Sequence, residues 1–307
     1  MRVFVTGATG FIGYSLVPQL VQAGHHVVGL CRSDAGAEAL VRAGVEVSRG
    51  DVNDLDHLRT AAQSADVVIH AAFNHDFSKL KESSENDRKV IETLGDLLKR
   101  TGRRLVVTSG TGLVHSASGG IALETDPHFT SAQFARAATE EATDALIEDG
   151  ANVVVVRLPQ VHDTLKQGRI SLHVELARKT GWVAYIGDGA NRVPAVHVSD
   201  AAQLFRFALE RGEAWARYHA VAEEGIAMRE IAEAIGDRLG MPVKSITPGE
   251  ASEYFGALAQ LATLDLAASG ELTRRKLAWT PSGPSLLADL SIRGNGGEFL
   301  SHGGIQR

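Results

Sequence analysis

The segment TGATGFIG, residues 6–13, is the part of the sequence whose residue types and spacing most clearly indicate chemistry. Its three glycines follow a short apolar run at residues 3–5 and open a helical pattern. Glycines at this point allow a tight turn and close approach of the backbone to a phosphate, and the free N–H groups of the next helix bind the anion. The segment predicts a dinucleotide-binding turn with contacts from Gly7, Thr9, Gly10, Phe11, Ile12 and Gly13.

The residues after the second predicted strand bear on which dinucleotide is bound. A carboxylate at this point would accept the ribose hydroxyls of NAD. Here Cys31 ends the strand, and Arg32 and Ser33 follow it. A guanidinium binds a 2′-phosphate in bidentate fashion, whereas a carboxylate repels it. Arg32 and Ser33 therefore favour NADP(H), and the nearby Asp34 keeps NAD(H) open as the alternative.

Imidazole and hydroxyl groups follow the fourth and fifth predicted strands. His75, beside Asp76, lies at the edge where open α/β sheets bind ligands, and an imidazole can donate a proton near neutral pH. Ser109 and Thr111 are candidates to polarise a substrate carbonyl. The simpler alternatives are a surface or capping role for His75 and a turn role for the two hydroxyls.

The second half of the sequence offers two more histidines. His162 stands four residues before Lys166. His197 precedes Ser199 and Asp200, residue types that cap helices at the N-terminus, so one of these two is expected to cap the helix that follows. Both histidines are candidate substrate contacts, and a solvated loop or a place beside the cap is the simpler alternative for each.

Short apolar runs that alternate with helical patterns must position these residues. Nearly continuous apolar strands are typical of a parallel sheet covered on both faces. The alternation predicts an α/β fold with a doubly wound parallel sheet of the Rossmann type. The expected strands are 3–5, 27–30, 45–47, 67–70, 105–108 and 153–157, and the expected helices are 11–22, 35–42, 55–62, within 79–100 and within 131–148.

The pattern loosens after Pro159. Helical patterns at 170–180, 199–211, 228–239 and 250–262, with small strands between them, predict a smaller C-terminal α/β lobe for substrate. The expected domains are 1–160 for the dinucleotide, with later contributions near 193–220, and 161–293 mainly for substrate. The glycine-rich residues 294–307 are expected to form a flexible tail.

Composition excludes several classes of partner. The 307 residues carry a net charge of −6, which provides no basic surface for nucleic acid or an anionic membrane. The single cysteine, Cys31, excludes an intrachain disulfide and a cysteine metal cluster, and no zinc-like spacing of His and Glu occurs. No signal peptide opens the chain, and no apolar run reaches the roughly 18 residues that span a bilayer. We expect a small-molecule substrate, no metal and a cytoplasmic location.

Further motifs accompany the glycine turn: Gly50-Asp51-Val52, His70-Ala71-Ala72, Thr108-Ser109-Gly110, Arg157-Leu158-Pro159 and VHVSD at 196–200. Together with TGATGFIG they resemble the extended or atypical short-chain dehydrogenase/reductases, the NAD-dependent epimerase/dehydratase-like family, over nearly the whole chain. The resemblance implies a homodimer formed through helices within 79–100 and 131–148. The cofactor contacts that it implies are Asp51, Val52, Ala71, Ala72, Phe73, Pro159 and Val161.

The usual catalytic pair of that family is a tyrosine with a lysine one helical turn later, which lowers the pKa of the phenol. The four tyrosines of this chain are followed four positions on by Pro18, Gly189, Ala222 and Leu258, so the pair is absent. The resemblance places Ala132 at the tyrosine position and Arg136 at the lysine position. Arg136 can hold the cofactor ribose, but a guanidinium does not release its proton. Catalysis therefore needs another proton donor.

Three functions remain open at this point. The leading hypothesis is an NADP(H)-dependent oxidoreductase for a small carbonyl, alcohol or related substrate, with Arg136 at the ribose, Ser109 or Thr111 at the substrate and His75 as proton donor. The second is a non-catalytic dinucleotide-binding regulator or sensor, for which the absent tyrosine is the natural explanation. The third is an epimerase, dehydratase or other lyase that uses the cofactor transiently.

Overall fold

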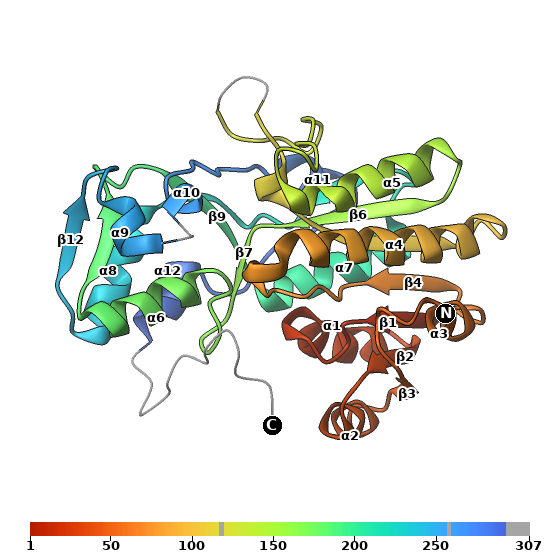
Figure 1. Ribbon diagram of the computed structural model, residues 1–307. Helices are drawn as coiled ribbons and strands as arrows, with labels where there is room; N and C mark the ends of the chain where they lie inside the picture. Colours follow the sequence, from red (N-terminus) through yellow and green to blue (C-terminus); the bar gives the residue numbers. More distant parts are fainter. Residues whose placement is uncertain (117–119, 257–258, 293–307) are drawn as a thin grey trace.

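A seven-stranded parallel sheet forms the centre of the structure, a computed structural model that describes residues 1–116, 120–256 and 259–292 (Figure 1). The strand order is β10-β6-β5-β4-β1-β2-β3, so the order reverses between β1 and β4, the point at which open α/β sheets bind ligands. The predicted doubly wound Rossmann fold is confirmed. The strands are β1 (Arg2–Thr6), β2 (His26–Cys31), β3 (Glu46–Arg49), β4 (Val67–His70), β5 (Arg104–Gly110), β6 (Val153–Leu158) and β10 (Arg217–His219).

Helices cover both faces of this sheet because successive side chains of its central strands are apolar and point to opposite faces. Val5 packs with Leu16 and Phe205 on one face, and Phe4 packs with Leu94 on the other. The helices of the first face are α1 (Phe11–Gln22) and α7 (Val198–Arg211), and those of the second are α3 (Leu55–Ala62), α4 (Leu80–Lys99) and α5 (Ala138–Glu148). The remaining elements of this part are α2 (Asp34–Arg42), η1 (Phe77–Lys79), η2 (Thr111–Leu113) and η3 (Ala135–Ala137).

A smaller α/β lobe follows β6 and lies at one end of the large sheet, to the left in Figure 1. Its strands form a three-stranded sheet, β11-β9-β7, and a two-stranded parallel sheet, β12-β8. Val174, Ile231 and Leu290 belong to its apolar core. Its elements are β7 (Gln160–His162), α6 (Ile170–Thr180), β8 (Val183–Ile186), β9 (Arg192–His197), β11 (Glu223–Ala227), α8 (Met228–Leu239), β12 (Val243–Ile246), α9 (Ala251–Phe255), α10 (Ala259–Ala262) and α12 (Leu286–Ser291). The helix α11 (Glu271–Leu277) packs instead against α7 and β10 of the large sheet.

Two local expectations were wrong. The helical pattern at 250–262 forms two short helices, α9 and α10, because Gly256 adopts φ 55° and ψ −127°, which ends α9. The N-cap of α7 is His197, whose side chain accepts from the N–H of Ser199. Asp200 is instead buried and accepts from the N–H groups of Ser282 and Gly283. The expected tail, 294–307, lies outside the described residues.

The glycine turn brings β1, α1 and the end of β4 into close backbone contact. Gly7 has φ 71°, and a Cβ atom on it would lie 2.6 Å from the carbonyl oxygen of Ala71. A Cβ atom on Gly13 would lie 2.2 Å from the carbonyl oxygen of Gly7. Both distances are too short for real atoms, so glycine is required at these two positions for packing as well as for phosphate approach.

Membrane-spanning helices and metal-binding clusters are both absent from the described ranges. No helix there is both long enough and apolar enough to cross a membrane. Within the same ranges, His, Cys, Asp and Glu side chains form no group of three or more suited to a metal ion.

The contact at Gly13 leads to a first prediction. Gly13→Ala forces a methyl group against the backbone of Gly7, and overpacking of this kind costs about 1–3 kcal/mol of the free energy of unfolding. Urea unfolding followed by circular dichroism measures the loss. The control is Gly249→Ala, because the nearest atom to a Cβ there is 3.8 Å away. Equal stability of the two variants would contradict the packing argument.

Candidate functional site

The turn between β1 and α1 has the form of an anion-binding cradle. The N–H of Gly10 donates to the carbonyl of Gly7 at 2.9 Å, which closes the turn. Gly10 is the N-cap of α1 and carries no side chain to accept from the N–H groups of the first helical turn. These N–H groups and the positive end of the helix dipole therefore suit the pyrophosphate of a dinucleotide. The absence of Cβ atoms at Gly7 and Gly13 fits that group sterically.

A chain of buried hydrogen bonds leads from the turn to helix α4. Thr6 and His70 are register partners at the ends of β1 and β4. The hydroxyl of Thr6 accepts from the N–H of Ala72 at 3.3 Å and lies 2.8 Å from Nδ1 of His70. Nε2 of His70 lies 2.9 Å from Oδ1 of Asp87. Since a carboxylate accepts, Nε2 carries the proton and Nδ1 accepts from Thr6.

Asp87 connects this chain to Arg136. Nη1 of Arg136 donates to Oδ2 of Asp87 at 2.8 Å. Burial alone would raise the pKa of Asp87, but the charge of Arg136 and the hydrogen bond from His70 outweigh it, so the pKa is lowered and the carboxylate is ionised. The Arg136 guanidinium also stacks on the ring of Phe73 at 3.9 Å, and the His75 ring meets Phe73 edge-on at 5.3 Å. Arg136, Phe73 and His75, three predicted site residues, thus lie together.

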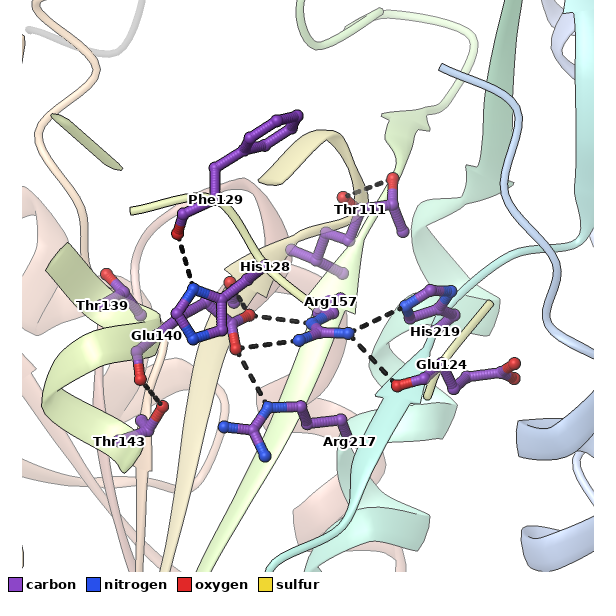
Figure 2. Close-up of polar contacts among 12 residues, drawn as sticks. Thr111, Glu124, His128, Phe129, Thr139, Glu140, Thr143, Arg157, Arg217 and His219 are labelled. Carbon is purple, nitrogen blue, oxygen red and sulfur yellow. Dashed lines mark hydrogen bonds and ion pairs between the residues drawn. The ribbon is translucent and has the colours of Figure 1, made fainter. Parts of the chain in front are cut away.

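A second polar network, centred on Glu140 (Figure 2), fixes the side chain of Ser109. Its hydroxyl donates to Oε1 of Glu140 at 2.6 Å. Arg157 donates to both oxygens of Glu140, at 2.8 and 3.0 Å, and Arg217 donates to Oε2 at 3.1 Å. Glu140 is fully buried, yet the two arginines hold its pKa at about 2 against the effect of burial. The hydroxyl of Ser109 is therefore directed into the protein interior.

His219 completes this network as a neutral acceptor. Its Nδ1 lies 2.9 Å from the carbonyl of Ser269, so Nδ1 carries the proton and Nε2 faces Nη1 of Arg157 at 3.4 Å (Figure 2). Burial, and then the charge of Arg157, lower the pKa of His219 to about 3. The carbonyl of Glu124 accepts from the same guanidinium at 3.3 Å. The motif that contains Arg157 therefore has a structural role in joining α5 to β6 and β10.

Four charged side chains surround the ends of β2 and β3. Arg32 lies 3.4 Å from Asp51 between Nη1 and Oδ2. Arg49 lies 2.6 Å from Asp34 between Nη2 and Oδ1. Cys31 and Arg49 are register partners, so the two guanidinium groups belong to neighbouring strand ends. Asp34, the carboxylate that kept NAD(H) open, is thus held in an ion pair.

The other predicted site residues are distributed as follows. Thr111 is buried, and its hydroxyl makes a long contact of 3.5 Å with the carbonyl of Leu158. His162 is fully buried, and its Nδ1 lies 2.7 Å from Asp289. His197 is partly buried, with its ring 5.7 Å from that of His162. Among the cofactor contacts implied by resemblance, Val161 is buried, and Asp51, Val52, Ala71, Ala72, Phe73 and Pro159 are half-buried.

Sequence reasoning missed several residues that take part in these arrangements. Asp87 and Glu140 are acidic residues within predicted helices. A charged side chain at such a position is normally exposed to solvent, but these two are buried. Arg49 directly precedes the Gly50-Asp51-Val52 motif, so its position at a strand end was a signal that could have been used. Lys166 had been noted only for its spacing from His162.

The comparisons with known proteins concern the family and the fold of the chain. Residues 3–221 match the NAD dependent epimerase/dehydratase family. An uncharacterized protein of Schizosaccharomyces pombe is 42% identical over 292 residues, 95% of this chain and 98% of the relative. Another uncharacterized protein, of Saccharomyces cerevisiae, is 36% identical over 293 residues, which are 94% of this chain and 98% of that relative. The dTDP-glucose 4,6-dehydratase of Streptomyces venezuelae, crystallised with NAD, superposes with a TM-score of 0.76 at 21% identity over 95% of each chain.

The fold and the family match define an extended short-chain dehydrogenase/reductase, a class that includes NAD(P)-dependent dehydratases, epimerases and reductases. Within that class this chain belongs to the NAD dependent epimerase/dehydratase family. The resemblance noted in the sequence motifs is thereby confirmed.

The buried Glu140 leads to a second prediction. Because its pKa is about 2 in the folded chain and about 4.5 ordinarily, its contribution to stability is complete above about pH 4.5 and disappears as the pH falls toward 2. Glu140→Gln leaves Arg157 buried without its carboxylate, so we expect a loss of about 3–5 kcal/mol at pH 7 that shrinks below pH 4.5.

Urea unfolding of wild type and variant at pH 7, 4 and 3 measures this difference. The exposed Glu148→Gln on the same helix is the control and should follow the wild type at each pH. A constant difference between Glu140→Gln and wild type from pH 7 to pH 3 would argue against an ionised, ion-paired Glu140.

Proposed function

We propose that this chain is an NADP(H)-dependent oxidoreductase that acts on a small carbonyl, alcohol or related substrate. The observation that carries the proposal is the contact of Arg136 with Phe73 and of Phe73 with His75, next to the end of β4 and the glycine turn. Through these contacts a cation, Arg136, and a titratable group, His75, lie together at the edge of the sheet where this fold binds ligands. A bound nicotinamide would supply or accept the hydride.

Each side chain has a separate role in this proposal. Arg136, held by Asp87 and stacked on Phe73, binds the cofactor ribose in place of the absent lysine. His75, exposed on the loop after β4, donates the proton to the developing alkoxide. Thr111 polarises the substrate carbonyl. We favour it over Ser109, because the hydroxyl of Ser109 donates to a carboxylate at 2.6 Å, whereas that of Thr111 makes only a long contact of 3.5 Å with the carbonyl of Leu158. His197 is the proposed substrate contact, since His162 is fully buried.

The choice of NADP(H) rests on two arginines rather than one. Arg32 follows β2, and Arg49 ends β3 beside it, so both can reach a phosphate on the 2′-oxygen of the adenosine ribose, with Ser33 between β2 and α2. Arg49 also neutralises Asp34, which would otherwise repel that phosphate. Asp51, Val52, Ala71, Ala72, Phe73, Pro159 and Val161 remain proposed contacts along the rest of the dinucleotide, and a cytoplasmic homodimer is the proposed setting.

Cofactor selectivity provides the third prediction. Arg32→Asp and Arg49→Gln each remove a charge-assisted hydrogen bond to the 2′-phosphate, so we expect the affinity for NADPH to fall about tenfold or more in each. The affinity for NADH should stay the same or rise. Fluorescence titration of both dinucleotides measures the two affinities. Arg42→Gln, an exposed arginine of α2, should leave both unchanged. Unaltered selectivity in both variants would count against the proposed phosphate site.

Turnover provides the fourth prediction. The purified protein should oxidise NADPH in the presence of a panel of small aldehydes and ketones, measured by the loss of absorbance of the reduced nicotinamide. His75→Gln should lower kcat about 100-fold or more, because a general acid contributes at least that factor. His26→Gln, at the opposite edge of the sheet, is the matched control. Full activity of His75→Gln would exclude His75 as the proton donor.

Two other functions are distinguished by the same assay. The absent Tyr-Lys pair and the engaged hydroxyl of Ser109 favour a dinucleotide sensor as the second candidate. A sensor would bind NADPH without oxidising it with any compound of the panel. An epimerase or lyase, the third candidate, would convert a substrate with no net change in the cofactor.

A further inference from the structure

The loop between β7 and α6 is tightly constrained around Lys166. The N–H of Asp163 donates to the carbonyl of Lys166 at 2.9 Å. The carboxylate of Asp163 in turn accepts from the N–H groups of Leu165 and Lys166, at 2.8 and 2.6 Å. Buried amide side chains fix the rest of the loop: Gln160 donates to the carbonyl of Gln167, and Gln167 donates to the carbonyl of Asp163. The backbone of Lys166 is therefore held in place.

The side chain of Lys166 extends to the glycine turn. Its Nζ lies 5.2 Å from the centre of the Phe11 ring, within cation–π range. Phe11 is the first residue of α1 and belongs to the predicted phosphate-binding segment. Lys166 thus brings a positive charge from the smaller lobe to the start of that helix.

The charge of Lys166 is not neutralised by a direct partner. Arg32, Arg49 and Arg136 each lie within 3.4 Å of a carboxylate. Lys166 is half-buried, and within residues 1–116, 120–256 and 259–292 it forms no ion pair at 4.0 Å or less. Burial lowers its pKa, and the more distant Asp163 only partly opposes this effect. An anion bound at the adjacent turn would stabilise this partly desolvated ammonium group.

We infer that Lys166 binds the pyrophosphate of the dinucleotide and closes the loop after β7 over the glycine turn. This inference rests on the proposed dinucleotide binding. The turn itself supplies N–H groups and a helix dipole but no cation, since the first turn of α1 contains no basic residue. An ammonium group is a compact point charge that can contact a phosphate oxygen from the side opposite the helix.

Binding of three nucleotides provides the test. Wild type, Lys166→Met and Lys166→Arg are titrated calorimetrically with NADPH, ADP-ribose and adenosine 5′-monophosphate, the last of which has no pyrophosphate. We expect the affinity of Lys166→Met for NADPH and for ADP-ribose to be lower by about tenfold or more, because one charged contact is lost. Its affinity for adenosine 5′-monophosphate should change much less. Lys166→Arg, which keeps the charge, should retain most of the affinity.

A control variant and the other outcomes distinguish a failure of this inference from a failure of the proposed function. Lys179→Met removes an exposed lysine of α6 and should bind all three nucleotides like the wild type, and thermal melting verifies that each variant is folded. Wild-type protein that binds neither NADPH nor ADP-ribose would overturn the proposed function itself. Wild-type binding with an unchanged Lys166→Met variant, or with an equal loss for all three nucleotides, would overturn only the role of Lys166. A loss confined to NADPH would assign Lys166 to the nicotinamide half instead, which also contradicts the inference.

Discussion

The close backbone contact at Gly7 and Gly13 is the constraint on which the rest of the site depends. It sets α1 against β1 and the end of β4 at distances that a Cβ atom would prevent. The hydrogen-bonded chain to Asp87 begins one residue before Gly7, at Thr6, and Lys166 approaches the same turn at Phe11. The phosphate cradle, the position of Arg136 and the loop after β7 are therefore coupled through one short segment. A shift of that segment would displace all three.

Arg136 holds a positive charge beside Phe73 in a chain whose sequence contains no Tyr-x-x-x-Lys pair. Its planar guanidinium is held by a buried carboxylate, Asp87, and by the face of Phe73. Because Asp87 is itself oriented by His70, the position of this charge depends on residues from three elements of the large sheet and its helices. A fixed, ion-paired charge suits binding and orientation, and the proposed function therefore assigns proton transfer to another group, His75.

The network of Glu140, Arg157 and Arg217 has a different purpose. It ties α5 to β6 and to β10, the strand that returns from the smaller lobe to the large sheet. Ser109 points into this network because its place in β5 alternates with Thr108, whose hydroxyl donates to the carbonyl of His70. Two neighbouring hydroxyls of the same motif thus bond within the protein, that of Ser109 to helix α5 and that of Thr108 to strand β4.

The sequence alone determined the parts of this protein that depend on local pattern. Apolar runs and glycine spacing predicted the six first strands of the large sheet, the turn at residues 6–13 and the doubly wound fold, since these follow from the periodicity of side chains and the geometry of glycine. What the sequence did not determine was which charges meet. The pairing of Arg49 with Asp34, of Asp87 with Arg136 and of Glu140 with Arg157 joins residues 15, 49 and 17 positions apart, and only the folded backbone sets those distances. The cap at His197 and the break at Gly256 were likewise decided by tertiary contacts and backbone conformation, which outweigh the local preferences of Asp200 and of residues 250–262.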